Sequence, residues 1–167
     1  MKKTIKLTFA LLVLVIMSCT NDDSIIDQVD NNVERGAILR TIEAAPLNYD
    51  LRTPDVPWDV TLEMEDNNQG ALLDKLEVYV TFFDNTPENG TNPVDKQLAK
   101  TIPSSGFQIG PDGLPRTTLG LTLPEAVAGA GLTEDEFTGG DVFRVELELN
   151  LTDGRVFTKD DVNGNVA

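Results

Sequence analysis

The chain contains no histidine and a single cysteine among its 167 residues. Without histidine it cannot form a Ser-His-Asp or Cys-His nucleophile pair, and it has no imidazole general base. One cysteine closes no disulfide within the chain and cannot build a cysteine-rich zinc site. Basic residues are also scarce, with 13 Lys and Arg against 28 Asp and Glu. Since nucleic-acid binders need a basic surface, this balance predicts a protein that does not bind nucleic acid.

The N-terminus carries the pattern of a secretory signal. Three lysines precede residues 7–17, a run that is apolar except for Thr8. The run is too short to span a bilayer, which needs about 20 residues. It matches the apolar region of a signal peptide, and the only cysteine, Cys19, lies two residues after its end.

The segment Ile16-Met17-Ser18-Cys19 resembles a bacterial lipobox, with an aliphatic residue at −3, a small residue at −1 and then cysteine. The resemblance implies removal of residues 1–18 as a signal peptide and lipidation of Cys19. Two or three acyl chains would anchor the protein stably to a membrane. An ordinary signal peptide followed by a chance cysteine is the alternative.

Residues 19–34 are predicted to form a lipidated acidic tether, because after the cysteine they hold five acids and no basic residue. A short helix with four aliphatic residues on one face is the alternative. The acids Asp22 and Asp23 are similar to the surface-export signal of Bacteroidetes-type lipoproteins. Asp23-Ser24-Ile25 resembles the O-glycosylation tripeptide of that group. Together they imply a lipoprotein of the outer membrane that faces the cell surface.

Residues 35–160 are predicted to form the folded domain, followed by a polar C-terminal tail over 161–167. Alternation of apolar and polar residues is typical of strands with one solvated face, and Asp153-Gly154 favours a hairpin turn. Short helical turns are expected at 124–129 and 133–136. The predicted strands are 36–42, 58–65, 76–84, 97–102, 116–123, 142–151 and 155–159.

About seven strands without a long amphipathic helix predict an all-β fold. An antiparallel β-sandwich of the immunoglobulin-like type fits this count best. No disulfide is available, so packing of apolar side chains must hold the two sheets together. We expect Leu147, on the apolar face of 142–151, to lie in that core.

Acidic pairs on the predicted strands do not indicate an enzyme. A glycosidase needs two carboxyl groups facing across a cleft, about 5 to 10 Å apart. Glu63 with Glu65, and Glu146 with Glu148, lie on outward faces by alternation. They are typical of a solvated sheet face that also discourages edge pairing. The sequence therefore predicts a non-enzymatic protein.

The loop 84–95 is the candidate metal site. Asp84, Asn85, Glu88 and Asp95 offer carboxylate and amide oxygens of the kind that calcium prefers on flexible loops. Ordinary turn chemistry is the alternative explanation for the same residue types. Calcium is the one cofactor that the sequence suggests, and no other is expected.

Tyr49 is the candidate ligand-binding residue. It lies in a loop bounded by prolines, where we expect its ring to be exposed. Carbohydrate-binding sites commonly present tyrosine or tryptophan rings as platforms, so an exposed Tyr49 could serve in that way.

Four segments of the domain, GAILRTI (36–42), FDNTPENG (83–90), GLPRT (113–117) and LNLTDGRVFT (149–158), are similar to small Bacteroidetes lipoproteins. Those proteins accompany outer-membrane nutrient-uptake systems of the starch-utilisation kind. The resemblance implies a surface accessory to a TonB-dependent transporter and its glycan-binding lipoprotein, without a catalytic motif. Family members continue past the hairpin, so a final strand beyond Ala167 is also expected.

The sequence thus favours a non-enzymatic outer-membrane lipoprotein that acts as an accessory binding module in nutrient uptake. A structural or adhesive surface module that binds another protein through a sheet edge is the first alternative. A divergent hydrolase is the second.

Overall fold

The computed structural model describes residues 36–45, 48–86, 90 and 93–161. The chain divides into two compact units, Met1–Glu34 and Arg35–Ala167, and every described residue belongs to the second. The predicted signal peptide, the lipidation at Cys19, the acidic tether and the tail after Asp161 lie outside the described residues.

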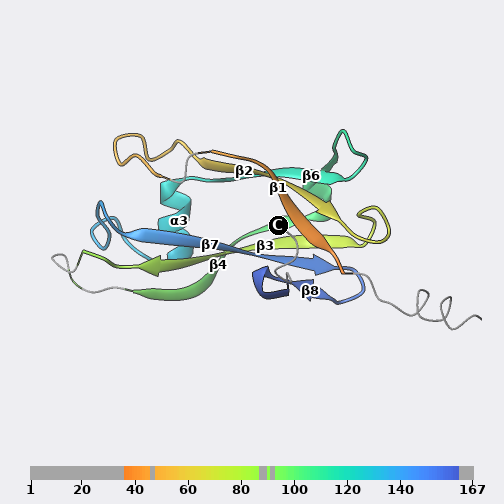
Figure 1. Ribbon diagram of the computed structural model, residues 1–167. Coiled ribbons are helices and arrows are strands. Elements are labelled where there is room, and N and C mark those ends of the chain that lie inside the picture. The colour runs from red at the N-terminus through yellow and green to blue at the C-terminus, as the bar shows by residue number, and fades with distance from the viewer. Residues whose placement is uncertain (1–35, 46–47, 87–89, 91–92, 162–167) are drawn as a thin grey trace, which may run out of the picture. The chain divides into compact units, whose positions relative to one another are not determined.

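The described residues form two antiparallel sheets of four strands each (Figure 1). The first sheet has the order β1-β2-β6-β5 and the second has the order β4-β3-β7-β8. This confirms the predicted all-β class and a sandwich of two sheets. The strands are β1 (Ile38–Ala44), β2 (Trp58–Glu65), β3 (Leu73–Phe83), β4 (Val94–Pro103), β5 (Gln108–Ile109), β6 (Pro115–Leu121), β7 (Val142–Leu151) and β8 (Val156–Phe157). The helical elements are the 3₁₀ turns η2 (Ser104–Gly106) and η3 (Lys159–Asp161) and the α-helix α3 (Leu123–Ala130).

The two sheets meet through the apolar faces that alternation places on each strand. Leu62 of β2 and Leu119 of β6 pack against Leu76 and Val78 of β3, and all four are at most 2% exposed. Burying one such side chain stabilises the fold by roughly 1.5 to 3 kcal/mol. A core of this kind needs no disulfide, so the unit Arg35–Ala167 carries its own core.

Helix α3 lies between the sheets at one end of the sandwich (Figure 1). Thr122 begins it with a capping box, in which the Thr122 Oγ1 accepts the N–H of Glu125 and the Glu125 carboxylate accepts the N–H of Thr122. Gly131, with φ of 71°, ends it in the left-handed conformation that glycine adopts without strain. The sequence predicted only a helical turn here.

The strand after the hairpin is shorter than predicted. We expected 155–159, but β8 contains only Val156 and Phe157. Thr158 then turns away, because the Asp161 carboxylate accepts hydrogen bonds from its N–H at 2.7 Å and from its hydroxyl at 2.9 Å. These two hydrogen bonds hold the chain in a turn directly after Phe157.

Candidate binding site

Three loops meet at the end of the sandwich where α3 lies. They connect β1 to β2, β3 to β4, and α3 to β7. The last residue of β3, Phe83, pairs with the first residue of β7, Val142, which places two of these loops together. The N–H of Leu123 donates to the carbonyl of Pro54 at 3.1 Å, which ties the β1–β2 loop to the start of α3.

The β1–β2 loop, the α3–β7 loop and helix α3 border two adjoining depressions with cavity volumes of about 380 and 690 Å³. Both are lined by Leu51, Leu123, Phe137 and Thr138, so we treat them together as the end groove. The size is that of small-molecule sites, which commonly measure about 300 to 1,000 Å³. Its apolar lining includes Leu51, Pro54, Val127, Leu132 and Phe137, and its polar lining includes Asn48, Thr133, Glu134, Thr138 and Asp141.

Tyr49 lines the smaller depression, but its ring is half-buried rather than fully exposed. It packs against a core cluster that contains Phe82 and Leu121. Its hydroxyl donates to the carbonyl of Leu121 at 2.9 Å. Burial, with a smaller contribution from the negative charge of Glu125, raises the pKa of Tyr49 to about 12. The hydroxyl therefore stays protonated, and Tyr49 forms a fixed wall of the end groove.

Asp141, which sequence reasoning missed, holds two of the three loops together. Its carboxylate accepts the N–H of Asn85, the hydroxyl of Thr86 and the N–H of Thr138, each at 2.8 Å. Burial raises the pKa of Asp141, but these hydrogen bonds outweigh it and hold that pKa below its usual value. One feature of the sequence could have pointed to Asp141. It follows Gly139 and Gly140, and aspartate commonly shapes a turn in such a segment.

The residues predicted to bind calcium do not lie in a single loop. Asp84 accepts the N–H of Thr86 at 3.0 Å, and the Asn85 side chain donates to the carbonyl of Gly140 at 3.1 Å. Asp95 is exposed on β4, which begins at Val94, so the predicted loop boundary was wrong. Glu88 lies outside the described residues.

Within the described residues, no group of three or more His, Cys, Asp or Glu side chains is placed to hold a metal ion. Since Glu88 cannot be placed, calcium binding at this loop stays a prediction.

The outward acids are engaged in ion pairs. Glu63 was expected on a solvated face, but its side chain is fully buried between Arg40 and Arg116, at 2.6 Å from each. Both arginines are its direct neighbours across the sheet, Arg40 on β1 and Arg116 on β6. Glu146 pairs with Lys159 at 3.5 Å, and Glu148 pairs with Lys96. These contacts give the carboxylates structural roles.

No helix in the described part of the chain is long and apolar enough to cross a membrane. Comparison of the chain with protein-family models, with curated proteins and with solved structures gives no match. The end groove is therefore identified from its geometry.

Proposed function

We propose that this protein is a non-enzymatic lipoprotein of the outer membrane that faces the cell surface and acts as an accessory binding module in nutrient uptake. The lipobox-like sequence that ends at Cys19, and the acids directly after it, support the anchor and its address. A TonB-dependent transporter complex is the partner that the resemblance of the domain implies.

We further propose that the sandwich is of the immunoglobulin-like type. In that fold, strands A, B, E and D form one sheet and strands C, F and G form the other, which C′ can extend. The orders β1-β2-β6-β5 and β4-β3-β7-β8 correspond to A-B-E-D and C′-C-F-G. This correspondence covers every strand of the described residues, and it supports the finer assignment.

The end groove is the observation that carries the binding function. Its lining combines apolar side chains with hydrogen-bonding ones, the combination that binds and orients ligands in small-molecule sites. Asp141 and Tyr49 hold its walls in place through hydrogen bonds. A rigid sandwich that presents loops in this way is a common architecture for binding.

Ion pairing of the outward carboxylates favours binding over hydrolysis. A hydrolase of the glycosidase kind needs one carboxyl group held protonated as the acid. Glu63 is instead held ionised, because its hydrogen bonds with Arg116, and next with Arg40, lower its pKa despite burial. A structural or adhesive module that binds another protein through a sheet edge is the alternative, favoured by the short β8, which pairs only with Leu149 and Asn150 of β7. A divergent hydrolase is the second alternative.

A panel of oligosaccharides, titrated calorimetrically into residues 20–167, tests the binding function. Leu51 is 54% exposed and lines both parts of the end groove, so Leu51→Ser should weaken binding at least tenfold without unfolding the domain. Val156 is 46% exposed on β8 and lines neither part, so Val156→Ser is the matched control and should bind like wild type. A wild-type protein that binds no sugar, or equal affinities in all three proteins, would contradict the proposal.

A further inference from the structure

The end groove consists of two parts with different chemistry. The smaller depression combines apolar side chains with the amide of Asn48, the hydroxyl of Thr138 and the carboxylate of Asp141. The larger depression is apolar apart from Thr133, Glu134 and Thr138. Since Thr138 lines both, the two parts are continuous. A ligand that fills the whole groove must therefore join a hydrogen-bonding group to an apolar one.

Helix α3 supplies one wall of the larger depression with two rows of apolar side chains. Residues four apart lie on the same side of a helix. The rows are Leu123 with Val127 and Pro124 with Ala128. At the end of the helix the N–H of Leu132 donates to the carbonyl of Val127 at 3.0 Å, which fixes the wall before any ligand binds. Binding to a preformed wall needs little ordering of the protein.

The rest of the larger depression suits an aliphatic chain better than the face of a sugar ring. Leu51 borders it and is 54% exposed. The ring that lines it, Phe137, packs edge-on against Phe143 with the centroids 6.0 Å apart, and Phe137 packs against the core cluster that contains Phe82. The other apolar lining is aliphatic. This part of the groove therefore offers a hydrophobic surface rather than a flat aromatic platform.

Charge narrows the class of ligand further. Among the described residues that line the groove, Glu134 and Asp141 carry charge, and both are acidic. The carboxylate of Asp141 is already engaged by Asn85 and Thr138, but its negative charge remains. An anionic ligand would meet like charges in a chain whose net charge is −15, and such contacts are unfavourable. The groove therefore favours a neutral ligand.

We propose that the end groove binds neutral glycosides that carry an alkyl or acyl chain. The sugar lies in the smaller depression, where Asn48 and Thr138 offer hydrogen bonds to its hydroxyl groups, and the chain lies in the larger depression along α3. This inference rests on the proposed binding function and names the class of ligand that the same site takes. Varying the sugar and the chain independently separates the two.

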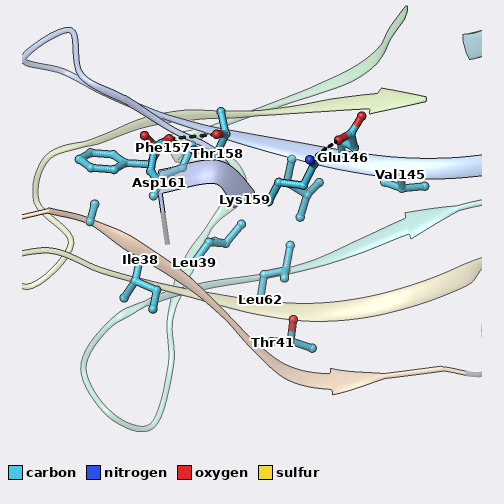
Figure 2. Close-up of a pocket in the computed structure, with 13 residues that line it drawn as sticks. Ile38, Leu39, Thr41, Leu62, Val145, Glu146, Phe157, Thr158, Lys159 and Asp161 are labelled. Carbon is cyan, nitrogen blue, oxygen red and sulfur yellow. Dashed lines mark hydrogen bonds and ion pairs between the residues drawn. The ribbon is translucent and has the colours of Figure 1, made fainter. Parts of the chain in front are cut away.

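A second apolar cavity, of about 350 Å³, lies between β1 and β7 (Figure 2). Two pairs of its polar side chains are bonded to each other. The Nζ of Lys159 lies 3.5 Å from the carboxylate of Glu146, and the hydroxyl of Thr158 donates to Asp161 at 2.9 Å. These groups are engaged within the protein, so we assign the glycoside to the end groove. Because an alkyl chain alone could enter this cavity, a control variant is placed at Thr41, which lines it.

Calorimetric titration of residues 20–167 with alkyl maltosides, from methyl to octyl, tests the proposal. This segment contains the whole unit Arg35–Ala167 and lacks the lipidated Cys19. All titrations stay below the micelle concentrations of the maltosides. Wild type should bind about two- to fourfold more tightly for each added methylene group, because burial of a methylene is favourable. The gain should stop once the larger depression is filled.

A matched pair of variants locates the chain. Ala128 is exposed on α3 and lines only the larger depression, so Ala128→Glu should cover the apolar wall with a charged side chain and remove the gain per methylene. Both residues favour helix, so the domain should stay folded. Thr41→Glu adds the same side chain at an exposed position of the second cavity and should keep the gain of wild type. Thermal melts followed by circular dichroism check that each variant is folded.

The sugar is tested separately. Asn48 is exposed and lines only the smaller depression. Asn48→Ala should weaken the binding of every maltoside by the same factor and leave the gain per methylene unchanged. Octyl glucoside and octyl glucuronide differ by one carboxylate. The glucuronide should bind wild type about fivefold more weakly, because Glu134 and Asp141 repel it.

The outcomes separate this inference from the proposed function. Equal affinities of wild type for methyl and octyl maltoside would overturn the inference and leave the proposed function in place. A gain per methylene that Thr41→Glu removes and Ala128→Glu keeps would overturn it by assigning the chain to the second cavity. A glucuronide that binds as tightly as the glucoside would contradict the neutral ligand class. Failure of every sugar and every maltoside to bind would contradict the proposed function and this inference with it.

Discussion

At the scale of single residues, Glu63 is a charged side chain that is fully buried. It lies on the outer face of β2, where Arg40 and Arg116 cover it from both neighbouring strands. Alternation correctly placed Glu63 outward but could not show that two arginines would shield it. A buried carboxylate of this kind is stable only while its partners are present, because an unpaired charge away from water is costly.

Glu63→Gln should lower the melting temperature, and the difference from wild type should depend on pH. The pKa of Glu63 is lowered in the folded state, first by its hydrogen bond with Arg116. Its contribution to stability is therefore complete above the unfolded pKa of about 4.3 and is lost as pH falls through the lower folded value. Melts from neutral to acidic pH should show the difference shrinking in that range. A constant difference would contradict the ion-pair account.

Leu76→Ala should cost more stability than Leu147→Ala. Leu76 is 0% exposed in the core, and such a truncation costs about 2 to 5 kcal/mol. Leu147 was expected to be core as well, but it is half-buried and lines the cavity between β1 and β7. Its removal creates little new void, so the cost should be smaller. Urea unfolding at low protein concentration measures both, and equal costs would place Leu147 in a closed core.

At the scale of elements, period-two alternation predicted the long strands well. β2 has the bounds expected from its sequence, and so has β7. Short strands and strand ends were not predictable, because contacts distant in the sequence set them. β5 exists only through its pairing with Gln108 opposite Arg116 and Ile109 opposite Pro115. β8 ends early because Asp161 binds Thr158.

The candidate site was predicted only in part. Tyr49 was named from the sequence and lines the end groove, yet its bond to Leu121, 72 residues away, has no local signal. Asp141 was missed because the loop it holds, at Asn85, is 56 residues away. Residues that bind through local turn chemistry can be named from sequence, whereas residues that join distant loops require the fold.

Calcium binding at the β3–β4 loop remains a prediction, which a change in stability would test. When calcium is present at 100-fold excess over the dissociation constant of a site, its binding should raise the free energy of unfolding by about 2.7 kcal/mol. Asp84→Ala should abolish that increase if the Asp84 carboxylate is a ligand. Thermal melts in calcium and in chelator measure the effect. Identical wild-type melts in both conditions would leave this loop as a connector.

At the scale of the whole molecule, the proposed lipoprotein combines an acidic domain with a lipid anchor. A net charge of −15 on the full chain gives the domain no attraction for an anionic bilayer surface. Attachment to a membrane would then depend on the acyl chains at Cys19, of which two suffice for stable anchoring. The domain carries its own core and its own groove, so it should fold and bind ligand whether or not it is anchored.

Detergent partition of the full chain and of Cys19→Ala tests the anchored binding module most directly. Wild type expressed in a bacterium with lipoprotein processing should enter the detergent phase, and intact-mass analysis should show a chain that begins at a lipidated Cys19. Cys19→Ala should remain in the aqueous phase when released, or keep residues 1–18 uncleaved, and should carry no lipid. A Cys19→Ala protein that is processed and still partitions into detergent like wild type would contradict the account.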